Sequence, residues 1–219
     1  MSGEELVCVD CGERFRLPDD VAARYPGWRP QRCRRCHQRA RGAARGAGSG
    51  GGGRRGGGRE PDRTTSEVLE RFDAGPTTGV FTDGAADPNP GPGGWGAVYV
   101  VDDEIVAEDW GHEPHTTNNR MELTALIAGY DLVPRGTSAT VYTDSRLAVD
   151  TITAWAPTWE RRGWRRRSGE VENLDLVKAL YERAVARPEI ELRWIKAHAG
   201  SKWNEYADAL ATAYRRGER

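Results

Sequence analysis

Four acidic side chains occur in four separate segments whose residue patterns place them at strand ends or on helices. These residues are Asp83, Glu122, Asp144 and Asp208. Asp83 and Asp144 follow runs of β-branched and aromatic residues typical of strands, whereas Glu122 and Asp208 lie in segments with the apolar spacing of helices. A fold that gathers the four carboxylates would form a cage of oxygen atoms, which hard divalent cations prefer as ligands. Taken one at a time, each acid could equally be an exposed strand end or a helix cap.

A second group of metal-ligating side chains lies near the N-terminus. All four cysteines fall in the first 36 residues as two Cys-x-x-Cys pairs, Cys8 with Cys11 and Cys33 with Cys36. Two such pairs can hold one structural Zn²⁺ with four thiolates, and a redox pair or unliganded thiols are the alternatives. The segment, with Gly12-Glu13-Arg14-Phe15 after the first pair, resembles small bacterial zinc-ribbon domains. We therefore predict a zinc-ribbon-like domain over residues 1–40, a fold that does not by itself indicate a task.

Residues 41–63 are rich in glycine and arginine and lack large apolar side chains. Such a sequence cannot repay the entropy of ordering, so we expect a flexible tether that leads into a domain at residues 64–219. The tether could be a soluble spacer or an Arg-Gly segment that holds a polyanion. The charge distribution favours binding of a polyanion, because residues 1–59 carry about +7 while the whole chain has a net charge of −1.

The chain has no apolar run long enough to span a bilayer, and its first residues lack the pattern of a secretory signal. We therefore expect a cytoplasmic protein that makes no membrane contact.

The elements that must position the four acids follow in a regular order from residue 79. The patterns predict strands at 79–84, 95–101, 104–110, 139–143 and 190–195, and helices at 117–132, 145–154, 174–186 and 201–214. This order, βββαβααβα, indicates an α/β domain whose sheet begins antiparallel and continues with parallel strands.

These segments together resemble type 1 ribonuclease H from about Thr78 to Ala211. The motifs that carry the resemblance are Thr82-Asp83-Gly84, Asn89-Pro90-Gly91-Pro92-Gly93-Gly94, Thr117-Asn118-Asn119-Arg120-Met121-Glu122, Thr143-Asp144-Ser145, Trp194-Ile195-Lys196-Ala197-His198-Ala199-Gly200 and Asn204-Glu205-Tyr206-Ala207-Asp208-Ala209-Leu210-Ala211. One motif alone is weak, whereas six in this order are specific. The resemblance implies an RNase H-like fold with a five-stranded mixed sheet flanked by helices. It also implies an endonuclease that cuts the RNA strand of RNA–DNA hybrids and leaves 5′-phosphomonoesters.

The resemblance implies that the four carboxylates bind two Mg²⁺ or Mn²⁺ ions and that His198 joins them in catalysis. Two metals about 3.5–4 Å apart can activate a water, stabilise the phosphorane and neutralise the leaving oxygen. His198 matches a mobile histidine of the family that assists proton transfer or product departure, and its loop of small residues permits movement. A lone histidine in a loop is otherwise usually just exposed to solvent.

Substrate contacts are expected from a second set of residues. Asn89, Asn118 and Asn119 match family positions in the minor groove of the hybrid, where carboxamides can bond ribose 2′-hydroxyls, and Thr117 matches one near a DNA phosphate. Turn and helix-cap chemistry would also explain these four. A Trp/Arg-rich segment resembles the family's basic protrusion through Trp155, Trp159, Arg161, Arg162, Trp164 and Arg165. Trp155 could equally pack between helices, and Arg146 stands where the family commonly has Gln.

Two rival functions remain open at this point: a non-catalytic hybrid-binding module with the same fold, and a related polynucleotidyl transferase such as an integrase. Intact carboxylates argue against the first, and the Asn pair with the basic protrusion argues against the second. The expected partner is an RNA–DNA hybrid, bound by a monomer, and the zinc ribbon could recruit a protein partner.

Overall fold

The structure is a computed structural model that describes residues 3–8, 11–18, 62–166 and 169–217. Contacts within the chain divide it into two compact units, Met1–Gly58 and Arg59–Arg219. No helix in the described ranges is both long and apolar enough to cross a membrane.

The first unit contains an antiparallel hairpin of β1 (Gly3–Val7) and β2 (Arg14–Pro18). Cys8 follows β1 and is buried, Cys11 is exposed, and the amide of Gly12 donates to the carbonyl of Cys8 at 2.9 Å. The turn between the strands thus carries the first Cys-x-x-Cys pair. Cys33, Cys36 and residues 41–61 of the expected tether lie outside the described residues, so the zinc site and its domain boundaries stay predictions.

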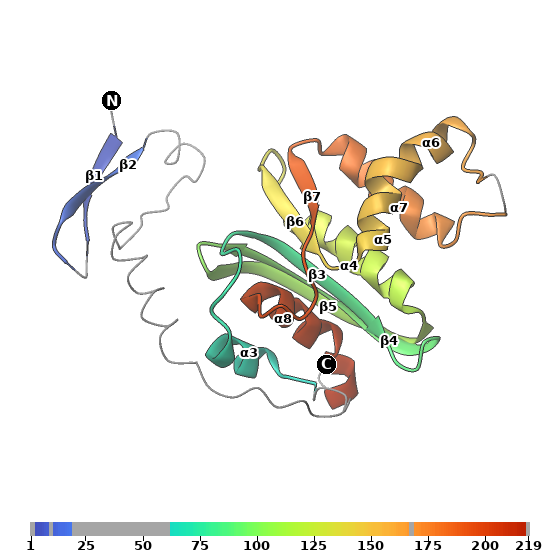
Figure 1. Ribbon diagram of the computed structural model, residues 1–219, viewed down its shortest axis with the longest axis horizontal. Helices are drawn as coiled ribbons and strands as arrows, with labels where there is room; N and C mark the ends of the chain where they lie inside the picture. Colours follow the sequence, from blue (N-terminus) through green and yellow to red (C-terminus); the bar gives the residue numbers. More distant parts are fainter. Residues whose placement is uncertain (1–2, 9–10, 19–61, 167–168, 218–219) are drawn as a thin grey trace. The chain divides into compact units, whose positions relative to one another are not determined.

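The second unit is built on a five-stranded mixed sheet (Figure 1). Its strands are β3 (Gly79–Ala86), β4 (Gly91–Val101), β5 (Glu104–Thr116), β6 (Ala139–Thr143) and β7 (Ile190–Trp194), in the spatial order β5-β4-β3-β6-β7. The first three pair antiparallel, and β6 pairs parallel with both β3 and β7. The predicted α/β class and change of strand direction are therefore confirmed. β3, β4 and β5 are each longer than the sequence pattern indicated.

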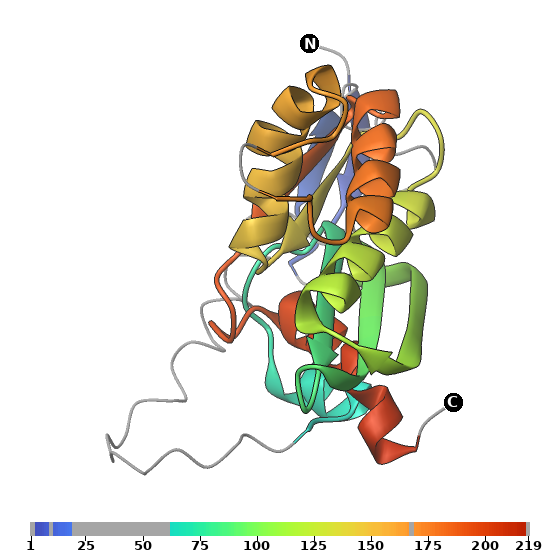
Figure 2. The ribbon, with the colours of Figure 1, turned by 90° about the vertical axis from the view of Figure 1, so that its right-hand side faces the viewer.

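Side chains along β3 alternate between the two faces of the sheet, and apolar residues point to both. Helices therefore cover both faces. Val80 belongs to a core cluster with Leu126 and Leu180, while Phe81 belongs to a second cluster with Trp203. The first cluster contains α4 (Asn118–Leu132) and α7 (Leu174–Ala186), and the second contains α8 (Lys202–Ala211) and α3 (Thr65–Arg71). Figure 2 shows α4 (yellow-green) beside α7 (orange) on one side of the sheet.

The remaining helical segments differ from the sequence expectation. The helix expected at 145–154 is α5 (Arg146–Asp150), which runs on through a π-helical turn (Thr151–Trp155) into α6 (Ala156–Arg161). The last predicted helix is α8 followed by a 3₁₀ turn (Ala213–Arg216). α3 was not predicted at all.

Two glycines let helices approach the sheet closely enough to bring the acidic residues together. A side chain at Gly84 would collide with the backbone of Met121 and Glu122, so α4 can approach the end of β3 only because this residue has no Cβ. A side chain at Gly96 of β4 would collide with the Cβ of Leu210 and the carbonyl of Ala207, both in α8 on the opposite face. The carboxylates on α4 and α8 are thereby held near the end of β3 from two sides.

Candidate active site

The four acidic residues come from four elements and converge at the end of β3. Asp83 lies within β3, Glu122 in the second turn of α4, Asp144 directly after β6 and Asp208 in α8. Each side chain is partly exposed to solvent. Ser145, the neighbour of Asp144, bonds to Glu122, and a carboxylate oxygen of Asp208 lies within 4.8 Å of ligand atoms of His198 and Glu205.

Asp83 is the most perturbed member of the group. Burial raises the pKa of its carboxyl well above the usual range, and the charges of Asp144 and Asp208 add to this effect. A hydrogen bond with the carboxyl of Asp208 raises the pKa further, whereas the amide of Gly84, which donates to Oδ1 at 2.8 Å, opposes the shift. Without a cation, this carboxylate therefore lies in a site that disfavours its negative charge.

Asp144 stands beside Asp83 in a more balanced environment. Burial is the largest cause that raises its pKa, and the charge of Asp208 adds to it, whereas His198 and a hydrogen bond from Asn204 lower the pKa. The indole N–H of Trp194 donates to the Asp144 carbonyl at 3.0 Å and so fixes the backbone that carries this carboxylate.

Glu122 is held by a serine that sequence reasoning missed. The hydroxyl of Ser145 donates to Glu122 Oε2 and also accepts from the amide of Ala148 at 3.3 Å, which caps α5. Burial and the charge of Asp144 raise the pKa of Glu122, and the Ser145 hydrogen bond lowers it. The position of Ser145 next to Asp144 could have pointed to it. Its hydrogen bond to Glu122, 23 positions away, could not be predicted from the sequence.

His198 lies close to Asp208 and Glu205. Its side chain is 61% exposed, and its Nδ1 lies 4.0 Å from Oε2 of Glu205. Nitrogen or oxygen atoms of His198, Glu205 and Asp208 all lie within 4.8 Å of one another. Glu205 was not among the predicted site residues, although it stands three positions before Asp208 and therefore on the same helix face.

A cavity of about 600 Å³ opens beside these carboxylates. Five of the eleven expected substrate-contacting residues line it, namely the three asparagines, Thr117 and Arg146, together with two of the acids. The full lining is Asn89, Thr117, Asn118, Asn119, Glu122, Asp144, Ser145, Arg146, Leu147, Glu172 and Asn173. Glu172 and Asn173 were missed. The φ angle of +52° at Asn173 marks a local backbone conformation that no spacing pattern reveals.

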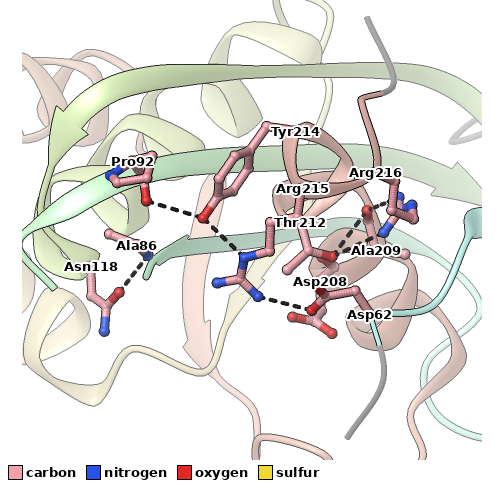
Figure 3. A network of polar contacts seen from close by, with 10 residues as sticks. All are labelled: Asp62, Ala86, Pro92, Asn118, Asp208, Ala209, Thr212, Tyr214, Arg215 and Arg216. Atoms are coloured by element: carbon pink, nitrogen blue, oxygen red, sulfur yellow. Dashed lines mark hydrogen bonds and ion pairs between the residues drawn. The ribbon is translucent and has the colours of Figure 1, made fainter. Parts of the chain in front are cut away.

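Several of the groove residues also hold the local backbone. Asn118 Oδ1 accepts from the amide of Ala86 at 2.5 Å, and the Asn118 amide donates to Asn89 Oδ1 at 3.3 Å. Thr117 caps α4 by accepting from the amide of Arg120 at 3.4 Å. Figure 3 shows the Asn118–Ala86 bond and the side chain of Asp208 near the C-terminal end of α8. These residues thus make the turn and helix-cap hydrogen bonds that were considered for them, and they also lie on the groove wall.

Arg146 contacts the edge of the site rather than the carboxylates. Its guanidinium lies 5.6 Å from the centre of the Trp194 ring and pairs with Asp150 at 3.5 Å. The groove wall near Asp144 therefore carries a cation.

The segment expected to form the basic protrusion includes α6 and carries exposed basic side chains. Trp155 and Trp159 lie 5.9 Å apart and line a smaller hollow, and Trp164 packs edge-on against Tyr181 at 5.7 Å. Trp159 and Trp164 also contact the core. The exposed cations beside them include the expected Arg161, Arg162 and Arg165.

Comparison with known proteins gives a consistent result. The RNase H family matches residues 76–216. A protein named ribonuclease H from Granulibacter bethesdensis is 46% identical over 137 residues, which cover 62% of this chain and 90% of that protein. A ribonuclease H from Aromatoleum aromaticum is 47% identical over 133 residues, covering 60% and 86%. The chain spans only 59% of a third relative, the ribonuclease H of Methylorubrum extorquens, at 45% identity.

Among solved structures, LC9-RNase H1, described as a type 1 RNase H with the type 2 active-site motif, superposes with a TM-score of 0.55. It is 34% identical, and the match covers 67% of this chain and 76% of that one.

Proposed function

Because the chain belongs to the RNase H family, we propose that residues 64–219 form a catalytic domain that hydrolyses the RNA strand of RNA–DNA hybrids and leaves 5′-phosphomonoesters. The family match and the relatives named ribonuclease H support the reaction and its substrate class. The observation that carries the assignment to this site is the convergence of Asp83, Glu122, Asp144 and Asp208 from four elements, beside a groove that Glu122 and Asp144 line. A module that only bound hybrids would gain nothing from clustered negative charge facing phosphates, because like charges repel.

The residues of the site fit a pair of divalent cations. We assign as ligands Asp83, Glu122, Asp144 and Asp208. Their carboxylates supply hard oxygen atoms, and cations would offset the burial and the neighbouring charges that raise the pKa of Asp83. Asn204 adds an oxygen, Oδ1, which is buried and has no hydrogen-bond partner in the described part of the chain. Mg²⁺ or Mn²⁺ bound here would activate a water and stabilise the leaving oxygen of a phosphodiester.

The chain's own side chains would place the hybrid and move a proton. Asn89, Asn118 and Asn119 would exchange hydrogen bonds with 2′-hydroxyls in the groove, which tells RNA from DNA. The exposed imidazole of His198, close to Asp208, would give or take a proton at the reacting phosphate. Arg146 would bind a phosphate of the RNA strand, because its guanidinium is already held against Trp194.

We assign the remaining substrate contacts to Thr117, the cap of α4, and to the protrusion. Thr117 would meet a phosphate of the DNA strand. The protrusion would seat the same strand through the aromatic rings of Trp155, Trp159 and Trp164 and the cations Arg161, Arg162 and Arg165. The exposure of the three arginines supports this role.

For the N-terminal unit we propose a zinc ribbon over residues 1–40 with one structural Zn²⁺ on Cys8, Cys11, Cys33 and Cys36. The spacing of the cysteines and the turn that carries Cys8 support it. A tether over residues 41–63 would join the ribbon to the catalytic domain. The ribbon would add affinity for long hybrids or bind a protein partner, and the whole would act as a monomer in the cytoplasm.

The test is cleavage of a labelled RNA–DNA duplex, beside RNA–RNA and DNA–DNA duplexes, with and without Mg²⁺. We expect Mg²⁺-dependent cleavage of the hybrid alone, and a loss on the order of a thousandfold in kcat for Asp83→Asn or Asp144→Asn. Asp109→Asn is the matched control, because Asp109 also accepts from the next amide, that of Trp110 at 2.9 Å, but is exposed on β5. Near-normal turnover in Asp83→Asn at matched purity would refute the assignment.

A further inference from the structure

Residues 62–75, which we call the N-terminal strap, directly precede the part of the chain that matches the family. The strap contains α3, whose cap Thr64 accepts from the amide of Glu67 at 3.2 Å while Glu67 accepts from the amide of Thr64 at 2.8 Å. A helix of seven residues is not stable alone. It is held here by Val68, which is fully buried against α8 in the cluster that contains Trp203 and Leu210. Figure 1 shows α3 beside α8.

Both ends of the strap are bonded to the C-terminal part of the domain. Asp62 accepts from the guanidinium of Arg215 at 2.9 Å, a contact visible in Figure 3. At the other end, the amide of Lys202 donates to the carbonyl of Ala74 at 2.8 Å, and Ala74 forms a parallel bridge with Ser201. The strap thus reaches the loop that carries His198, which ends at Ser201.

Between these ends, Arg63 reaches the candidate active site. Its Nη1 lies 3.5 Å from Oε2 of Glu205, and the two side chains are only 12% and 4% exposed. The same Oε2 lies 4.0 Å from Nδ1 of His198. The Arg63 guanidinium is itself held over the ring of Phe72 at 5.4 Å. A buried carboxylate requires compensating charge, and here an arginine from outside the family match contributes it.

We propose that Arg63 is a positioning residue for the nuclease site, acting through Glu205 on His198. This inference rests on the proposed function, since it concerns the histidine assigned there to proton transfer. Arg63 neutralises Glu205 and fixes its Oε2, and that oxygen in turn restrains the exposed imidazole. Without Arg63, Glu205 adds an uncompensated negative charge beside Asp208 and its carboxylate no longer has a fixed orientation.

Loss of Arg63 should lower turnover rather than substrate affinity, because Arg63, Glu205 and His198 do not lie on the wall of the groove. Members of one hydrogen-bonded network change one another's effects by about twofold to a hundredfold. In the full-length protein we expect Arg63→Ala to lower kcat about tenfold with KM changed less than twofold. Arg63→Lys, which keeps the charge, should recover kcat to within about threefold of the parent.

The matched control is Arg71→Ala, because Arg71 lies on the same strap over the same Phe72 ring, at 5.8 Å, but is exposed. It should leave kcat unchanged. A double variant separates positioning from general loosening: in a His198→Ala background, Arg63→Ala should cost less than twofold. A full tenfold loss in that background, or an equal loss in Arg71→Ala, would overturn the inference.

A readout independent of activity is the ¹⁵N-detected resonances of the His198 imidazole at one fixed pH. Arg63→Ala should shift these resonances and Arg71→Ala should not; unchanged resonances in Arg63→Ala would overturn the inference even if hybrid cleavage were absent. Absence of cleavage by the unmodified protein would instead refute the proposed function, so the two failures are distinguishable.

Discussion

Ser145 joins the acidic cluster to the start of a helix, and replacing it by alanine tests both connections at once. Its hydroxyl donates to Glu122 and accepts from the amide of Ala148, and the residue is only 6% exposed. Ser145→Ala therefore removes a helix cap and leaves the half-buried carboxylate of Glu122 with one hydrogen bond fewer. The substitution adds no volume, so its effects come from these two lost bonds.

The magnitude follows from the two bonds. Loss of a serine cap costs about 1 kcal/mol in the free energy of unfolding. Loss of a hydrogen bond to a charged group costs about 1.5–3 kcal/mol more, reduced here because Glu122 is partly exposed. We expect about 2–3 kcal/mol in total, which lowers Tm by roughly 5–10 °C for a domain of this size. Because Ser145 orients a proposed metal ligand, the Mg²⁺ concentration for half-maximal cleavage should rise about tenfold.

Urea unfolding and a Mg²⁺ titration of hybrid cleavage measure the two effects. Ser201→Ala is the matched control, because Ser201 precedes α8 and is 7% exposed, but its hydroxyl makes no cap bond and has no hydrogen-bond partner among the described residues. It should change the free energy of unfolding by less than about 0.5 kcal/mol or stabilise the protein, since a buried unpaired hydroxyl is lost. Equal destabilisation by both substitutions would refute the hydrogen-bond account.

Two further predictions concern charge. In EDTA, Asp83→Asn should raise Tm at pH 7, because the raised pKa of Asp83 means that the folded state holds its proton more tightly than the unfolded chain, and the carboxyl destabilises the fold as pH rises above its usual pKa. The gain should vanish toward pH 4 in a calorimetric series, and a constant gain would contradict this origin. Replacing the arginines of the protrusion by Ala should raise KM more than it lowers kcat, and it should flatten the salt dependence of hybrid binding by up to about 0.9 per phosphate contact. The residues replaced are Arg161, Arg162, Arg165, Arg166 and Arg167. An unchanged slope would make them ordinary surface charge.

The sheet and its main helices were predictable because each has a strong local pattern. The helix at 174–186 matches the expected range, and the helix expected at 117–132 begins one residue later, at Asn118. α3 has no such pattern, since Val68 is its one buried residue and its stability comes from contact with α8. The continuation of α5 into a π-helical turn and α6 could not be predicted either, because a proline such as Pro157 is found at the start of a helix as well as at a break.

The same distinction applies to the site. The four acids could be named from the sequence because each lies in a short motif of its own. Ser145 and Asn204 lie in those motifs too, yet their bonds to Glu122 and Asp144 depend on where the other segments fold. The contact between Arg63 and Glu205 joins residues 142 positions apart, and neither neighbourhood indicates it. Local patterns thus identify the candidate ligands, whereas the residues that orient them require the tertiary structure.

The arrangement also explains how the fold tolerates a cluster of like charges. Burial and the neighbouring negative charges, which raise the pKa of Asp83, cost folding free energy, so the acidic side chains must be held by elements that do not yield. β3 is such an element, because Val80 and Phe81 are fully buried in different clusters on its two faces. The close approaches at Gly84 and Gly96 then fix α4 and α8 against the sheet, with little freedom for their carboxylates to separate. A cation can therefore stabilise the cluster by neutralising charge that the backbone has already gathered, and little of its binding free energy is spent on rearranging the protein.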